Sequence, residues 1–232
     1  MKIGILKTDT VNPALSPDFG EYPDMFQRLL HQVDPSLEFV TYDIESGEFP
    51  TNLDAVDAFL ITGSKSSVYE DKPWIRELEE FVRKLDSARA RLVGICFGHQ
   101  MVAQALGGAT RKADVGWGVG VHSADWLEKP AWAGDPASFR LLVSHQDQVL
   151  EAAPGTRVLA GSDFCPNAVC QIGDHILTFQ GHPEFIHDYS RSLLELRREQ
   201  IGEEVYHKGV ESLSQDTDHL SVARWIIDFM KG

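Results

Sequence analysis

A cysteine stands between two glycines near the middle of the chain, in the run Gly94-Ile95-Cys96-Phe97-Gly98. The apolar run Leu92–Ile95 is typical of a strand buried in a parallel sheet, and a helical pattern follows it. A tight turn of this kind from strand to helix is called a nucleophile elbow. It crowds the nucleophile, and glycines on both sides relieve that crowding. The positive end of the new helix favours the thiolate, and the N–H after the thiol can bond an oxyanion. The pattern predicts a thiol nucleophile at Cys96, although a small buried core cysteine also fits so short a motif.

A thiol nucleophile needs a base, and sequence context selects His182 among the nine histidines. His182 lies in Gly181-His182-Pro183-Glu184, directly after the apolar strand Ile176–Gln180. Open α/β sheets build their sites in the loops at the carboxyl ends of strands. Glu184 can orient the imidazole and stabilise its charged form, which would complete a relay of nucleophile, base and acid. A helix starting near Phe185 would instead make Glu184 a helix N-terminal acid.

A second glycine-bearing loop, Thr62-Gly63-Ser64-Lys65-Ser66-Ser67, follows the apolar strand Ala58–Thr62. Its small residues let backbone N–H groups approach a ligand oxygen, so we expect it to supply the second half of an oxyanion hole. A plain tight turn is the alternative. The loop does not match a phosphate-binding P-loop, because it has one glycine and its Lys-Ser pair lacks the required spacing.

The remaining cysteines and histidines indicate packing rather than metal binding. Cys165 and Cys170 lie in strand-like surroundings without an elbow or companions at ligand spacing, so no metal site is expected. His99 is expected to pack beside the elbow. His145 follows the apolar strand Phe139–Val143 and is expected to line the pocket. No cofactor is predicted.

Composition excludes several classes of protein. The 232 residues carry a formal charge of −14, whereas nucleic-acid binding needs a basic face. No stretch approaches the roughly 18 apolar residues of a membrane span, and the N-terminal apolar run is too short for a signal sequence. Three cysteines without regular spacing argue against a disulfide framework and for a reducing compartment. We therefore expect a cytoplasmic protein that binds neither nucleic acid nor membrane.

Short apolar runs alternate with amphipathic stretches through the first half of the chain, as βαβ units with a parallel sheet would give. Strands are expected at Lys2–Lys7, Glu38–Asp43, Ala58–Thr62 and Leu92–Ile95, and helices at Tyr22–Val33, Pro73–Leu85 and Gln100–Leu106.

The pattern changes after Gly108. Short strand-like segments separated by turn residues predict antiparallel ribbons near 116–126, 138–144, 156–162, 167–172 and 175–180. Two helices, Tyr189–Ile201 and Leu220–Met230, are expected around the polar segment Ser212–Asp218. We predict a single domain over residues 1–232 with a helical tail from about residue 189.

These motifs resemble those of the class I (triad) glutamine amidotransferases. The run G-I-C-F-G-H-Q at 94–100, the G-H-P-E at 181–184 and the glycine loop after the third strand fall in that family's order and spacing. The resemblance covers roughly Lys2 to His187. It implies an α/β, flavodoxin-like three-layer fold with a central mostly parallel sheet and an antiparallel extension.

The resemblance also implies a mechanism. Cys96 would attack the side-chain carboxamide of glutamine, His182 would pass a proton to the leaving ammonia, and Glu184 would orient His182. The γ-glutamyl thioester would then react with water to give glutamate. The N–H groups of Gly63 and Phe97 would form the oxyanion hole. The positions that hold the amino and carboxylate groups of glutamine are matched by Gln100, Ser144, His145 and Gln146.

Two departures leave the substrate open. Many members carry a second glycine or a proline where this loop has Lys65 and Ser66, which would narrow or recharge the pocket. The 45 residues from 188 to 232 are too few for an ATP-binding domain. A separate synthetase or acceptor subunit is therefore one option, and action alone on γ-glutamyl compounds is another. The leading hypothesis is glutamine hydrolysis. The others are γ-glutamyl peptide hydrolysis by the same relay, a catalytically idle regulatory module, and an α/β-hydrolase with a cysteine elbow.

Overall fold

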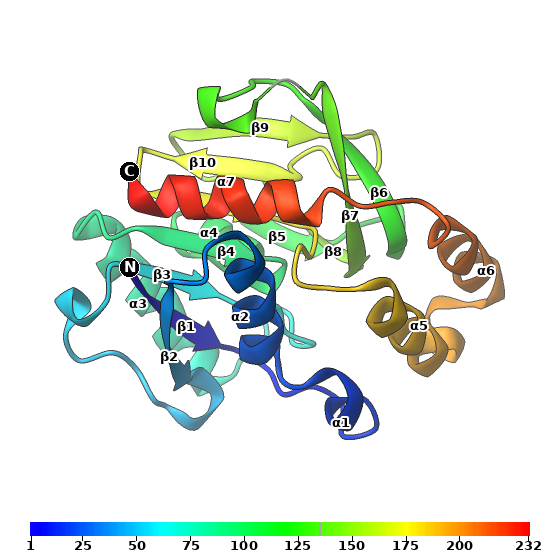
Figure 1. The fold of residues 1–232 in the computed structure, drawn as a ribbon, viewed down its shortest axis with the longest axis horizontal. Coiled ribbons are helices and arrows are strands. Elements are labelled where there is room, and N and C mark those ends of the chain that lie inside the picture. Colours follow the sequence, from blue (N-terminus) through cyan, green and yellow to red (C-terminus); the bar gives the residue numbers. More distant parts are fainter. Residues whose placement is uncertain (135) are drawn as a thin grey trace.

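A mixed sheet of nine strands forms the centre of the protein (Figure 1). The computed structural model describes residues 1–134 and 136–232. The strands are β1 (Lys2–Lys7), β2 (Glu38–Asp43), β3 (Ala58–Ile61), β4 (Leu92–Ile95), β5 (Ala109–Lys112), β6 (Gly118–Trp126), β7 (Ser138–His145), β8 (Asp147–Glu151), β9 (Thr156–Gly161), β10 (Val169–Ile172) and β11 (Ile176–Phe179). The α-helices are α1 (Ser16–Phe19), α2 (Tyr22–Val33), α3 (Pro73–Ser87), α4 (Phe97–Ala105), α5 (His187–Ile201), α6 (Glu203–Ser212) and α7 (His219–Lys231). No helix in the described part of the chain is long and apolar enough to cross a membrane.

The large sheet has a parallel half and an antiparallel half, in the order β2-β1-β3-β4-β11-β10-β9-β6-β7. Strands β2, β1, β3, β4 and β11 are parallel to one another, and β10, β9, β6 and β7 extend the sheet in antiparallel pairs. β5 and β8 form a separate two-stranded antiparallel sheet. The predicted change of pairing is present, but β11 returns to pair with β4 in parallel. A short apolar strand has the same sequence pattern whether its neighbour is parallel or antiparallel. The sequence therefore did not predict the parallel pairing of β11 with β4.

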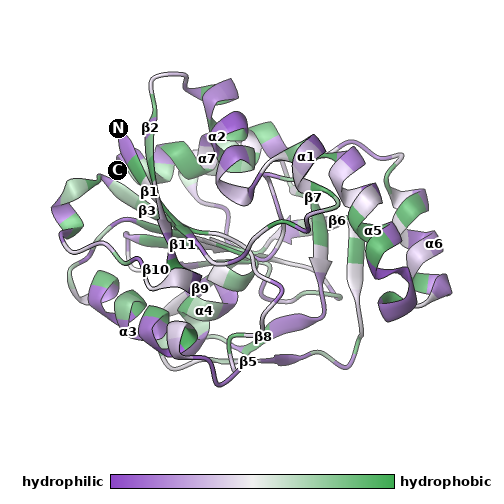
Figure 2. Ribbon diagram, turned by 90° about the horizontal axis from the view of Figure 1, so that it is seen from below, coloured by the Kyte–Doolittle hydropathy of each residue, from purple (hydrophilic) through white to green (hydrophobic). Residues whose placement is uncertain are grey.

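Helices cover both faces of the parallel half, which makes three layers (Figure 1). Successive residues of a strand point to opposite faces, and the buried residues divide accordingly. Ile3 and Ile5 of β1 pack in the cluster that includes α2 and α7, whereas Leu6 packs in the cluster that includes α3 and α4. The central strands are mostly hydrophobic, and hydrophilic and hydrophobic residues alternate along α3 (Figure 2). Burial on both faces explains why continuous apolar runs predict these strands.

Several elements differ from the predictions. The helix after the thiol begins at Phe97 rather than at Gln100, so that it starts directly after Cys96. Helix α6 and the short strands β5 and β8 are absent from the predicted elements. In α6 an added Cβ at Gly209 would lie 2.8 Å from Cγ2 of Val119 in β6. Close tertiary packing of this kind holds α6, and the sequence carries little signal for it.

The carboxyl ends of the parallel strands meet at one edge of the sheet. Asp9 lies just beyond β1, Gly63 just beyond β3, Cys96 directly after β4 and His182 just beyond β11. Open α/β sheets bind their ligands at such an edge. The fold therefore gathers these residues from four separate parts of the chain.

Candidate active site

Cys96 occupies a strained turn between β4 and α4. Its backbone has φ 52° and ψ −98°, and only one other non-glycine residue among those described, Arg89, has a positive φ. Residues with side chains rarely adopt this region, and such strain concentrates at functional sites. A Cβ added to Gly94 would lie 2.6 Å from the backbone oxygen of Gly98. A Cβ added to Gly98 would lie 2.6 Å from the backbone oxygen of Ile61. Both glycines are therefore required, and the thiol stands at the amino-terminal end of α4.

His182 is held in place by three contacts. Its backbone N–H donates to O of Leu142 at 2.8 Å, which ties the loop after β11 to β7. Its ring stacks on Phe185 with 3.9 Å between centroids, and Nδ1 lies 2.7 Å from Oε1 of Glu184. Both side chains of this pair are buried, Glu184 completely. The next helix begins at His187 with Ile186 as its N-cap, so Glu184 bonds the imidazole and does not cap this helix.

Nearby charge stabilises the protonated form of His182. Burial by itself lowers the pKa of an imidazolium, but the Glu184 carboxylate and the neighbouring Cys96 outweigh it and raise the pKa of His182 to about 10. The second carboxylate oxygen of Glu184, Oε2, is buried and has no hydrogen-bond partner among the described residues. At neutral pH this arrangement favours an imidazolium beside Cys96, and a neighbouring cation stabilises a thiolate.

The loop after β3 brings Gly63 against the same two side chains. An added Cβ at Gly63 would lie 2.9 Å from Cε1 of His182 and 3.7 Å from Cβ of Cys96. The backbone N–H groups of Gly63 and Phe97 donate no hydrogen bond within the described part of the chain. Two unpaired N–H groups beside a nucleophile can stabilise negative charge on a carbonyl oxygen. The structure thus brings together Cys96, His182, Glu184, Gly63 and Phe97, the residues predicted for catalysis and the oxyanion hole.

Gly63→Ala is expected to lower kcat/KM for any substrate of this site by about 100-fold. The added methyl group would displace the His182 ring, because Cε1 lies 2.9 Å from the new atom. Gly4→Ala is a matched control, since its Cβ would meet the Phe59 ring in the core at 3.1 Å without touching the site. Steady-state kinetics and thermal unfolding of both variants check this prediction. Equal losses of activity in the two variants would contradict it.

Lys65 does not enter the site as a free charge. Its ammonium group bonds the Asp9 carboxylate, and its backbone N–H donates to Oδ2 of Asp9 at 2.8 Å. The Asp9 side chain is only 3% exposed, and its hydrogen bond raises the pKa of Lys65. Thr8 holds the start of the loop by donating from its hydroxyl to O of Gly63 at 3.0 Å. The charge that Lys65 adds is therefore balanced within the protein by Asp9, a residue that belongs to no motif.

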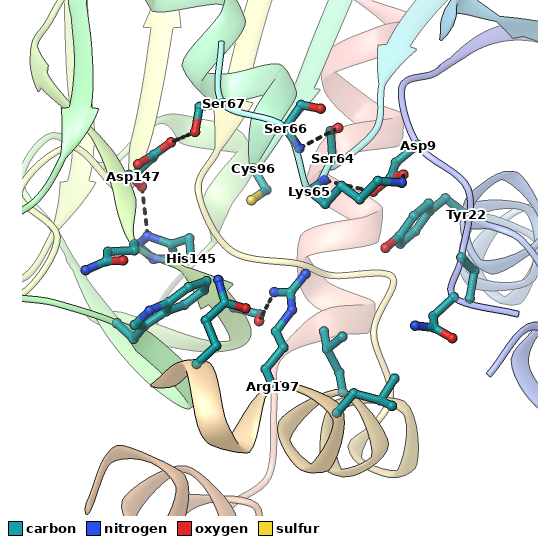
Figure 3. Close-up of a pocket in the computed structure, with 18 of the residues that line it drawn as sticks. Asp9, Tyr22, Ser64, Lys65, Ser66, Ser67, Cys96, His145, Asp147 and Arg197 are labelled. Atoms are coloured by element: carbon teal, nitrogen blue, oxygen red, sulfur yellow. Dashed lines mark hydrogen bonds and ion pairs between the residues drawn. The ribbon is translucent and has the colours of Figure 1, made fainter. Parts of the chain in front are cut away.

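A cavity of about 780 Å³ lies in front of Cys96 (Figure 3). Its walls come from the loops after β1, β3 and β7 and from one face of α5. The predicted substrate-binding residues all line it: Gln100, Ser144, His145 and Gln146. Gln100 donates to O of Asp147 at 2.8 Å and to Oε1 of Gln180 at 3.1 Å. Nε2 of Gln180 in turn donates to Sγ of Cys96 at 3.5 Å, so a polar chain links the cavity wall to the thiol.

Three polar residues of this region belong to no predicted set: Gln180, Asp147 and Arg197. Asp147 lines the cavity and accepts hydrogen bonds from the hydroxyls of Ser67 and, at 3.0 Å, Tyr69. Arg197 reaches into the cavity from α5 (Figure 3). Gln180 and Asp147 could have been predicted from the sequence, since each directly adjoins a predicted site segment. Arg197 had none, because helical spacing alone does not say what a helix faces.

The other thiols and His99 lie outside the reacting group. Nδ1 of His99 lies 2.7 Å from Oγ1 of Thr178, and burial lowers its pKa to about 4. Cys165 and Cys170 are free thiols, and burial raises the pKa of each to about 12. The described residues contain no cluster of three or more His, Cys, Asp or Glu that could hold a metal ion. Cys96 alone among the three thiols lies beside an imidazolium.

Residues 16–197 match the family model described as glutamine amidotransferase class-I. The chain belongs to the class I glutamine amidotransferase family. Among similar proteins, γ-glutamyl peptidase 3 of Arabidopsis thaliana is 37% identical over 62% of this chain and 61% of its own length. The match therefore spans less than two thirds of that relative. γ-Glutamyl peptidase 2 of the same plant is 30% identical over 82% of this chain and 81% of that protein.

A solved amidotransferase structure shares the fold. The glutamine amidotransferase from Thermotoga maritima aligns with a TM-score of 0.78 over 98% of this chain and 97% of that one. The two are 16% identical, so this likeness speaks for the fold and not for the activity. The α/β, flavodoxin-like amidotransferase fold predicted from the sequence is confirmed.

Proposed function

We propose that this amidotransferase-family chain hydrolyses γ-glutamyl amide bonds through a thioester on Cys96. The observation that carries the proposal is the group of Cys96, His182 and Glu184 beside a cavity of about 780 Å³, with His182 bonded to Glu184 at 2.7 Å. A thiol at a helix N-terminus, beside an imidazolium and two unpaired N–H groups, is suited to acyl transfer. The three free thiols support the reducing, cytoplasmic setting that the sequence predicts.

The reaction proceeds in two halves. The Cys96 thiolate attacks the carbonyl carbon of the γ-amide, and the N–H groups of Gly63 and Phe97 stabilise the resulting oxyanion. His182 gives its proton to the leaving nitrogen, and the C–N bond breaks to release the amine. Water then attacks the thioester while His182 takes up a proton, and glutamate leaves as the thiolate re-forms. Glu184 keeps Nδ1 of His182 protonated, which leaves Nε2 for the proton transfer.

A γ-glutamyl peptide is the substrate that we favour over glutamine. The cavity is large enough for a drug-sized ligand, whereas ammonia, the leaving group of glutamine, needs little room. Both of the relatives described above are named γ-glutamyl peptidases. Glutamine hydrolysis uses the same steps, and Gln100 and Ser144–Gln146 on the cavity wall support it as the second candidate. For that case, a separate synthetase or acceptor subunit stays a prediction.

Purified protein assayed with a γ-glutamyl dipeptide and with glutamine distinguishes the two substrates. We expect kcat/KM to be at least about 10-fold higher for the dipeptide, because only the larger leaving group adds contacts in the transition state. A higher kcat/KM for glutamine would make the chain a glutaminase. Turnover of neither substrate would instead indicate a catalytically idle module.

A further inference from the structure

The active-site cavity is lined by more cationic than anionic side chains, although the chain as a whole is strongly acidic. The whole chain carries −14, yet three of the five Asp, Glu, Lys and Arg residues lining the cavity are cationic: Asp9, Lys65, Lys112, Asp147 and Arg197. Asp9 and Lys65 neutralise each other. The remaining set is one anion, Asp147, and two cations, Lys112 and Arg197. Neither of these cations forms an ion pair within the described residues, so the cavity holds unpaired positive charge.

Arg197 is the cation that the fold holds in one position. Its Nη1 donates to Oγ of Ser144 at 2.8 Å, and its guanidinium carbon lies 5.8 Å from the centre of the Trp117 ring. The side chain rises from α5 into the cavity that Cys96 lines (Figure 3). No second hydrogen bond from Arg197 is formed in the described part of the chain, so its other N–H groups can bind a ligand. A planar guanidinium with free donors is suited to two-point binding of a carboxylate.

Lys112 belongs to a different wall of the cavity. It lies opposite Asp147 in the pairing of β5 with β8, and the N–H of the next residue donates to O of Gln146 at 3.0 Å. Lys112 and Asp147 therefore offer one positive and one negative charge on the same wall, which complements the carboxylate and ammonium groups of a glutamyl moiety. Arg197 comes from α5, a separate element, and its bond to Ser144 leaves its other N–H groups free for a second carboxylate.

We propose that Arg197 binds the carboxylate of the leaving amine and so selects γ-glutamyl peptides with a free C-terminal carboxylate. This inference rests on the proposed γ-glutamyl hydrolysis. A γ-glutamyl dipeptide carries one ammonium and two carboxylates, which match Asp147, Lys112 and Arg197 one for one. Glutamine carries only one carboxylate and leaves one cation without a partner. Arg197 thus determines specificity, and it touches none of the bonds that change.

Three substrates test the role of Arg197: γ-glutamylalanine, its C-terminal amide, and glutamine. We expect the wild type to favour the free acid over the amide by roughly 10- to 100-fold in kcat/KM. Arg197→Gln should lower kcat/KM for the free acid by the same factor and leave the values for the amide and for glutamine unchanged. Arg197→Lys should recover only part of the loss, because it restores the charge without the fork of donors.

Arg198→Gln is the matched control, because Arg198 stands on the same helix and bonds Glu203 at 2.7 Å instead of lining the cavity. Its kinetics should equal those of the wild type for all three substrates. Equal losses for all three substrates in Arg197→Gln would overturn the inference, since Arg197 would then act on the glutamyl group or on the fold. No loss for any substrate would overturn it as well. A wild type that hydrolyses neither dipeptide would refute the proposed peptidase activity itself, and the role of Arg197 with it.

Discussion

Cys96→Ala is expected to lower kcat/KM for γ-glutamyl substrates by at least about 10⁴-fold while the fold survives. Without the thiol no thioester can form, and the oxyanion donors and the cavity supply no other nucleophile. Cys96 as a whole is only 5% exposed, and alanine keeps the Cβ that cysteine already carries at φ 52°. The turn therefore tolerates the change. Steady-state kinetics and circular dichroism measure the two parts of this prediction.

Cys165→Ala and Cys170→Ala are the matched controls for the loss of a buried thiol. Burial raises the pKa of both thiols to about 12, so they stay protonated and unreactive at neutral pH. Both variants should keep wild-type turnover. A glutamine-like electrophile should label the wild type once, at Cys96, and should not label Cys96→Ala. Turnover by Cys96→Ala would disprove the thiol mechanism. Stoichiometric labelling of Cys96 in the wild type would exclude an idle module, and failure to label it together with no turnover would indicate one.

Glu184→Gln is expected to lower kcat by about 10²- to 10⁴-fold with little change in the overall fold. The amide matches the carboxylate in shape but lacks its charge, and it can present a donor to Nδ1 of His182. Burial, which lowers the pKa of His182, would then be opposed by Cys96 alone, and the pKa should fall from about 10. The pH–rate profile of the variant should therefore shift. A profile identical to that of the wild type would exclude the predicted role of Glu184.

The same substitution should change how stability depends on pH. The pKa of His182 is about 10 in the folded protein and about 6.5 when unfolded. The charged ring therefore stabilises the fold fully below about pH 6.5, and this contribution is lost as pH rises through about 10. The free energy of unfolding of the wild type should exceed that of Glu184→Gln most near pH 6, and the gap should narrow towards pH 10. Urea unfolding at several pH values measures the gap, and a constant gap would contradict the prediction.

The sequence by itself determined the parts of the protein that local geometry constrains. A tight turn admits few residues, and at Gly94 and Gly98 an added Cβ would lie 2.6 Å from a backbone oxygen. The residues next to Cys96 are therefore enough to predict the elbow. Apolar periodicity predicted the strands of the parallel half and the helices α2 and α3, since each buries one face or both. These local signals were enough to predict the family and the fold.

The charge and the outer wall of the cavity were decided only by the tertiary structure. From the sequence alone Lys65 is expected to be a free cation. In the folded protein it bonds the carboxylate of Asp9, 56 residues earlier in the chain. The sequence does not distinguish Arg197 from the other arginines of α5. Only the position of that helix brings Arg197 into the cavity beside Ser144. Such contacts join segments far apart in sequence, and the spacing of residues records which face a helix buries but not what that face meets.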